Sequence, residues 1–139
     1  MRNLVVLLTV LFSLSSFAQI EGRWKVVDFK TGNLRTVIQI YKKPDGKFYG
    51  RIAEVHEKIP SPNCEKCPGE FKNAPVIGLE IIQGLVAKGN GKWEDGKVID
   101  PESGKFYSCK ASLTKTGDLN LRGYLGISLL GRTETWIRE

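Results

Sequence analysis

The feature that most constrains this chain is a series of short runs in which apolar and polar residues alternate. No helical period follows residue 19. In the clearest run, 105–114, the residues Tyr107, Cys109, Ala111 and Leu113 share one face, and the other face is mainly polar. An alternation of period two is typical of a β-strand with one buried face and one wet face. We therefore expect an all-β protein.

About eight such runs follow one another at hairpin spacing. The expected strands are 22–29, 34–42, 47–56, 76–86, a short strand near 97–99, 105–114, 119–124 and 131–138. The turns between them are rich in Gly, Asn, Asp and Pro, as in Lys43-Pro44-Asp45-Gly46, where Pro presets φ and Gly accepts a left-handed conformation. Eight strands with one apolar face close naturally into a barrel. The sequence predicts a single antiparallel up-and-down barrel.

The first eighteen residues differ from the rest of the chain. Arg2 precedes an almost unbroken apolar run at 4–14, and Ser16-Phe17-Ala18 places small residues at the two positions that signal peptidase reads. This pattern predicts a secretory signal peptide at 1–18, cleaved before Gln19, and one domain at 19–139. The apolar run is about half of the roughly 20 residues that a spanning helix needs. We expect an exported protein, periplasmic or secreted, with no integral membrane segment after cleavage.

The charge of the domain is moderately basic. Without 1–18 the chain loses one Arg and no acid, so its net charge is 20 − 15 = +5. A basic protein can favour an anionic surface such as lipopolysaccharide or nucleic acid. The basic residues are scattered among acidic ones, which favours a mixed soluble surface, and we expect no nucleic-acid partner. The sequence does not determine the oligomeric state.

The segment 57–75 interrupts the strand pattern, because its prolines cannot donate to a sheet. It contains Cys64 and Cys67, and in an exported protein such a pair is expected to form a disulfide. Pairing of Cys109 with a loop cysteine is the runner-up, and Cys109 is otherwise expected to be a small buried side chain. The Cys-x-x-Cys spacing also suits a zinc site with His56, although an oxidising compartment favours the disulfide.

The motifs of common enzyme sites are missing from the sequence. His56 is the only histidine, and no Gly-x-Ser-x-Gly is present. The acidic residues lie mainly in turns, where Asp caps its own backbone, and no dinucleotide or phosphate-binding glycine motif occurs. We expect a binding protein with no catalytic residue, metal or cofactor.

Candidate ligand-binding residues are the aromatic and basic residues on the expected strands. They are Tyr49, Arg51, Tyr107, Arg122 and Tyr124. If some of them point into the barrel, they would line a pocket with an apolar wall and a few polar groups. Strand parity alone does not settle their direction. Tyr107 shares the apolar face and is the best candidate, with core packing as its alternative.

Both ends of the domain resemble a lipocalin. Gly22-Arg23-Trp24 opens the first strand, and Trp136-Ile137-Arg138 closes the last. In the lipocalin arrangement an Arg of the final strand covers a Trp of the first, so the Trp plugs the closed end and the guanidinium stacks on the indole. This resemblance implies that Trp24 and Arg138 close the barrel.

Longer stretches resemble a bacterial family. They are 78–85, 93–107, 122–126 and 131–138, and together they extend the resemblance from Gly22 to Arg138. The family is the one called domain of unknown function 2147. The resemblance implies an exported, lipocalin-like (calycin) barrel and no assigned reaction. We expect such a barrel to bind a small hydrophobic or amphipathic ligand; the alternative is a filled barrel that acts as an envelope-associated interaction module.

Overall fold

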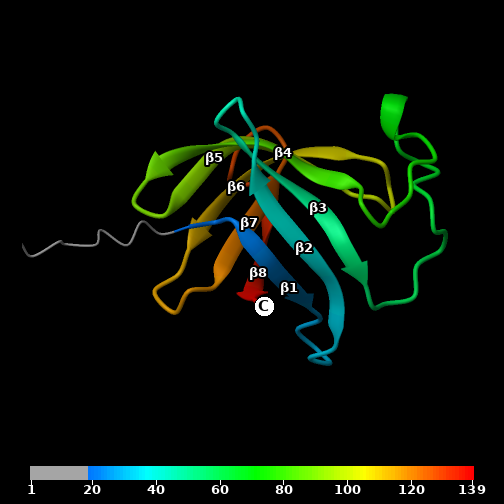
Figure 1. Ribbon diagram of the computed structural model, residues 1–139, viewed down its shortest axis with the longest axis horizontal. Helices are drawn as coiled ribbons and strands as arrows, with labels where there is room; N and C mark the ends of the chain where they lie inside the picture. Colours follow the sequence, from blue (N-terminus) through cyan, green and yellow to red (C-terminus); the bar gives the residue numbers. More distant parts are fainter. Residues whose placement is uncertain (1–18) are drawn as a thin grey trace, which may run out of the picture.

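The computed structural model describes residues 19–139, so the predicted signal peptide at 1–18 lies outside the described residues. Eight strands form a closed barrel in which each strand pairs antiparallel with the next, and the last pairs with the first (Figure 1). The strands are β1 (Gly22–Val27), β2 (Leu34–Lys42), β3 (Phe48–Val55), β4 (Glu80–Gly89), β5 (Lys92–Ile99), β6 (Phe106–Leu113), β7 (Leu119–Tyr124) and β8 (Gly131–Arg138). The prediction of a single antiparallel up-and-down barrel is confirmed.

Two strands differ from their expected ranges by more than two residues. β4 begins at Glu80 because residues 76–79 form a turn, in which the Leu79 amide donates to the Val76 carbonyl at 3.1 Å. β5 begins at Lys92, well before the expected short strand, and its register with β6 shifts between residues 93 and 96. Asp95 has a positive φ of 64° there. This irregularity breaks the alternation that sequence reasoning relies on.

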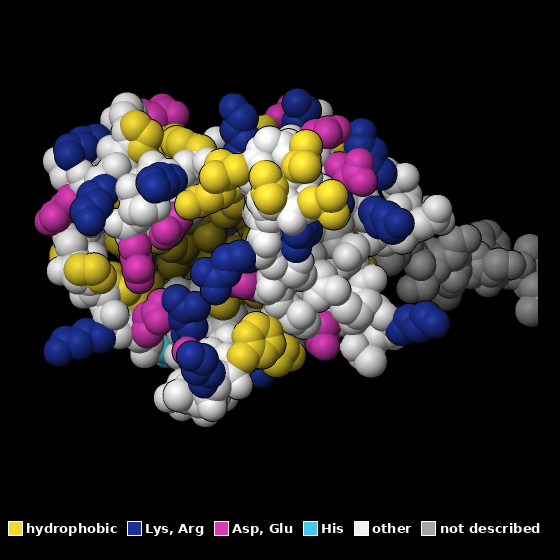
Figure 2. Space-filling model, turned by 180° about the vertical axis from the view of Figure 1, so that it is seen from behind, with side chains coloured by type: hydrophobic (Ala, Val, Ile, Leu, Met, Phe, Trp, Pro, Cys, Tyr) yellow, Lys and Arg dark blue, Asp and Glu magenta, His cyan; other side chains and the backbone are white. Residues whose placement is uncertain are grey.

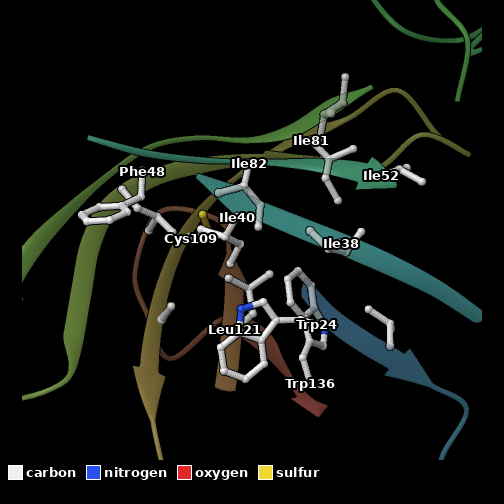
Figure 3. Close-up of a cluster of buried hydrophobic side chains, with 14 of the residues drawn as sticks. Trp24, Ile38, Ile40, Phe48, Ile52, Ile81, Ile82, Cys109, Leu121 and Trp136 are labelled. Atoms are coloured by element: carbon white, nitrogen blue, oxygen red, sulfur yellow. The ribbon is translucent and has the colours of Figure 1, made fainter. Parts of the chain in front are cut away.

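The barrel has a filled end and an open end. The start of β1, the end of β8 and the β2–β3, β4–β5 and β6–β7 turns lie at the filled end, and the other four connections surround the open end. Trp24 is fully buried, and Phe48 meets Trp93 edge-on with 6.4 Å between ring centroids. Figure 3 shows this core, to which strands all around the barrel contribute. Burial of each such side chain stabilises the fold by about 1.5–3 kcal/mol.

Arg138 covers the filled end. Its guanidinium carbon lies 4.1 Å from the centroid of the Trp24 ring. The same guanidinium donates to the carbonyl oxygens of Gln19 and Glu21, at 2.6 and 3.0 Å. The Trp24 indole donates to the Ile20 carbonyl at 2.9 Å. These bonds seat the segment before β1 against the filled end of the barrel.

The long connection between β3 and β4 packs against the barrel. Cys64 and Cys67 form the expected disulfide, and Cys109 is a free, buried thiol on β6. A short 3-10 helix, η1 (Gly69–Phe71), follows the disulfide. The ring of its last residue, Phe71, packs edge-on against Phe106 of β6, with 6.1 Å between the ring centroids. Within residues 19–139, no helix has the length and apolar character needed to cross a membrane.

Candidate functional site

A cavity of about 650 Å³ lies at the open end, and three of the four connections there contribute to its wall. Its volume lies within the range of about 300–1,000 Å³ that is usual for small-molecule pockets. Figure 2 shows a hollow with a hydrophobic floor and a border of acidic and basic side chains. Aliphatic and aromatic side chains from strands around the barrel form the apolar part of the wall: Val26, Ile38, Ile52, Ile81, Val98, Leu121 and Trp136.

β8 contributes two charged residues to the cavity wall. Arg132 and Glu134 belong to the wall and alternate along β8 with Thr133 and Thr135, which do not, so they lie on the same face as Trp136. The indole of Trp136 donates to a carboxylate oxygen of Glu134 at 3.1 Å. The Trp136 side chain is itself buried, so this bond fixes the Glu134 carboxylate beside the apolar floor.

A second polar group of the wall joins β2 to the start of the long connection. The Arg35 guanidinium makes two hydrogen bonds to the Glu57 carboxylate, at 2.8 and 3.3 Å. The hydrogen bond to Glu57 raises the pKa of Arg35, burial opposes this rise, and the charges of Glu57, Glu134 and Glu102 add to it. The charged groups of the mouth therefore act on one another across the opening.

Two of the five predicted ligand-binding residues line the cavity. Tyr107 and Tyr124 belong to its wall. Tyr49 and Arg51 do not, because the buried, inward positions of β3 are the residues between and beside them. The Tyr49 hydroxyl donates to Asp45 at 2.5 Å, and the Arg51 guanidinium donates to the Gln39 side-chain oxygen at 2.7 Å. The expectation of a pocket role for these two residues is not supported by their position.

Arg122 also lies outside the cavity wall, and its role is structural. Its Nε donates to the Ser128 carbonyl at 2.7 Å, and its Nη1 donates to the Thr133 hydroxyl at 2.9 Å. Arg122 therefore ties the connection between β7 and β8 to the strands on either side of it.

Sequence reasoning missed six charged residues of the mouth: Arg35, Glu57, Asp100, Glu102, Arg132 and Glu134. The sequence contained a signal for Arg132 and Glu134. They alternate with Trp136 along β8, so the three side chains share one face, and a Trp so close to the end of the barrel points inward. The Arg35–Glu57 pair had no comparable signal, since it joins a strand to a loop 22 residues away.

The described residues do not form the zinc site or the catalytic site that His56 could have joined. His56 is exposed, and its Nε2 lies 3.9 Å from Glu54. The disulfide occupies both thiols that a zinc site would have used. In the part of the chain that the structure describes, no group of three or more His, Cys, Asp and Glu side chains is placed to hold a metal ion.

Comparison with known proteins shows the family of the chain. The family described as an uncharacterized protein conserved in bacteria, domain of unknown function 2147, matches residues 22–138. The chain belongs to this family. No curated protein matches the sequence. Both the family and the barrel expected from the motifs are therefore confirmed.

A solved structure with the same fold is protein HP1028 of Helicobacter pylori, described as belonging to the lipocalin family. The two structures superpose with a TM-score of 0.75, over 87% of this chain and 83% of that chain, at 20% sequence identity. An identity this low shows the fold alone. This member of the domain of unknown function 2147 family is thus a lipocalin-like barrel.

Proposed function

We propose that this protein is an exported binding protein that holds a small amphipathic ligand in its barrel. The observation that carries the proposal is the cavity of about 650 Å³, which is apolar in its depth and charged at its mouth. A barrel filled by its own side chains would leave no such space. The open volume therefore favours a ligand inside the barrel over the alternative of a filled barrel that acts only through its surface.

The wall chemistry favours a ligand with an apolar tail and a polar head. The tail would pack against the floor around Ile38, Leu121 and Trp136, where removing apolar surface from water contributes about 25 cal/mol per Å². The head would lie among Arg132, Glu134 and the other charged groups of the rim. Because these groups offer both donors and acceptors, they would fix the orientation of a head group that does both.

Two features support export and a role without catalysis. A structural disulfide such as Cys64–Cys67 is typical of oxidising compartments, and residues 1–18 have the pattern of a signal peptide. Arg35 is paired with Glu57, and Glu134 accepts from the Trp136 indole, so part of the charged rim is held in place as suits a wall that orients a ligand. We assign this chain no reaction.

The cavity can be blocked at Gly123 of β7. A Cβ built at Gly123 meets Val98 at 3.6 Å and Tyr107 at 3.9 Å, which are ordinary contacts between cavity-wall residues. A larger side chain at this position would enter the cavity. Ser108 is exposed on β6 and lies outside the cavity wall, so Ser108→Phe adds a similar bulk outside it.

The test is a titration with oleate, read by the intrinsic tryptophan fluorescence and by native mass spectrometry. We expect saturable one-to-one binding, weakened at least tenfold by Gly123→Phe and unchanged by Ser108→Phe. If folded Gly123→Phe protein bound oleate as well as the unchanged protein does, the cavity would not be the site. Absence of oleate binding, combined with capture of a protein partner that is lost on deletion of residues 60–70, would support the interaction module instead.

A further inference from the structure

The connection between β7 and β8 exposes a cluster of large aliphatic side chains. Four of its six residues are aliphatic, and their exposed fractions are 58% for Leu125, 58% for Ile127, 85% for Leu129 and 66% for Leu130. We call residues 125–130 the apolar loop. Single exposed apolar residues are ordinary, but a contiguous group of them marks an interaction surface. Figure 2 shows hydrophobic side chains gathered beside the hollow.

The apolar loop is held in shape by hydrogen bonds. The Leu125 amide donates to the Leu130 carbonyl at 3.1 Å, and the Leu130 amide donates to the Ile127 carbonyl at 3.0 Å. Arg122 adds its bond to the Ser128 carbonyl at 2.7 Å. With its backbone fixed in this way, the loop presents its aliphatic side chains to solvent instead of folding them over the cavity floor.

The apolar surface of the loop is continuous with the cavity. Leu125 and Leu130 are exposed and also belong to the cavity wall. Ile127 and Leu129 extend the surface outward and do not belong to the wall. An apolar path therefore leads from the floor of the barrel, across the rim, to the outside of the molecule. A lipid surface fits such a path, because an amphipathic molecule could cross it without passing through water.

The charges near the apolar loop indicate which kind of partner surface the loop docks onto. The charged residues nearest the loop on its own two strands are Arg122 and Arg132, whereas the acidic residues of the mouth lie on the other connections and further along β8: Glu57, Asp100, Glu102 and Glu134. A second copy docked through this loop would bring four arginines together, which is unfavourable. An anionic lipid surface instead attracts basic residues, with about 1 kcal/mol for each one near it.

We propose that the apolar loop docks this protein onto an anionic lipid bilayer. Ile127 and Leu129 enter the interfacial region, and Arg132 faces the lipid phosphates. The docking surface is separable from the ligand site, because these two aliphatic residues lie outside the cavity wall.

The experiment is cosedimentation of the domain at 19–139 with vesicles made of phosphatidylglycerol and phosphatidylcholine in equal parts. We expect binding that falls with added salt, that is weak on pure phosphatidylcholine, and that drops about tenfold for Leu129→Ser and further for Ile127→Ser with Leu129→Ser. The matched control is Ile77→Ser, which removes an aliphatic side chain that is 61% exposed on the long connection between β3 and β4. We expect this control to bind vesicles like the unchanged protein.

Three outcomes would overturn the proposal: no binding to the anionic vesicles, equal binding by the loop variants, or an equal loss caused by Ile77→Ser. Self-association that disappears in Leu129→Ser, without vesicle binding, would assign the loop to a second copy. Oleate binding measured on the same variants should be unchanged, so a failure of docking is distinguishable from a failure of the cavity proposal.

Discussion

At the scale of single residues, Gly96 and Cys109 show how tightly the filled end is packed. These residues face each other across the β5–β6 pair. A Cβ built at Gly96 would lie 2.7 Å from Leu85 and 2.9 Å from the Cys109 sulfur, both closer than real contacts allow. Gly96 has an ordinary φ, so this packing is the reason that glycine fits the position.

We predict that Gly96→Ala destabilises the barrel by about 1–3 kcal/mol, the usual cost of overpacking a core. Urea unfolding followed by circular dichroism measures this change. The double variant Gly96→Ala with Cys109→Ala should recover part of the loss, because the smaller side chain removes one of the two clashes. Strict additivity of the two single changes would contradict this account of the contact.

The same packing makes the Cys109 thiol unreactive. Burial raises the pKa of Cys109 to about 12, so almost none of it is thiolate near neutral pH. We predict that iodoacetamide leaves the folded protein unlabelled and adds one group per chain in urea, as mass spectrometry would show. Labelling of the folded protein at the rate of a free thiol would mean that β5 and β6 separate readily.

The carboxylate of Asp28, in the turn after β1, makes the stability of the fold depend on pH. Backbone amides of Thr31 and Lys30 donate to its carboxylate at 3.0 and 2.8 Å and hold the pKa of Asp28 below its usual value. A lowered pKa stabilises the fold above the unfolded value of about 3.9, and this contribution is lost as the pH falls through the folded value. We therefore predict that the urea midpoint of Asp28→Asn falls less steeply below about pH 4 than that of the unchanged protein. Parallel curves for the two proteins would refute this role.

At the scale of elements, the long connection depends on the turn between β5 and β6. Gly104 of that turn has a φ of 72°, and a Cβ on it would lie 1.9 Å from the Lys66 carbonyl oxygen. The part of the connection between Cys64 and Cys67 therefore packs directly onto this turn, and both cysteines are buried. Its position also fixes Glu57, the partner of Arg35 at the mouth.

We predict that Gly104→Ala displaces the long connection and exposes its disulfide, so that dithiothreitol reduces Cys64–Cys67 faster than in the unchanged protein. Gly117 is the matched control, because it has a similar φ of 87° and nothing lies within 4 Å of a Cβ built on it. Gly117→Ala should add backbone strain without changing the rate of reduction. Equal rates in Gly104→Ala and the unchanged protein would show that the contact does not hold the connection.

The elements also show what a sequence can reveal about this fold. The alternation in β6, the recurrence of similar short runs and the turn chemistry were sufficient to predict the strand order and the barrel. The same alternation tells which residues share a face but not which face points inward, so Tyr49 and Arg51 remained candidates until the structure placed them outside. The packing of the long connection on Gly104 is a tertiary contact and leaves no periodic signal.

At the scale of the whole molecule, closure of the barrel is uneven. β1 and β2 pair over six residue positions, whereas β1 and β8 pair over only Trp24–Arg138 and Lys25–Ile137. Side chains reinforce this short seam, with Arg138 over Trp24 and an ion pair of 2.9 Å between Arg23 and Glu139. The seam joins the first strand of the barrel to the last, so the ring remains closed only while both ends of the domain hold together.

We predict that the barrel opens first at this seam, because it has the fewest backbone hydrogen bonds to break. In native-state hydrogen exchange, the amides of β1 that face β8 should exchange faster than those in the middle of β2 and β3. Arg138→Leu removes the stacking on Trp24 and the bonds to two carbonyl oxygens, so it should lower stability by about 1–3 kcal/mol and speed exchange in β1 most. Arg51→Leu, which removes an arginine from the outer face of β3, should leave exchange at the seam unchanged. If Arg138→Leu instead raised exchange evenly in all strands, the barrel would open as one cooperative unit and the seam would have no separate role.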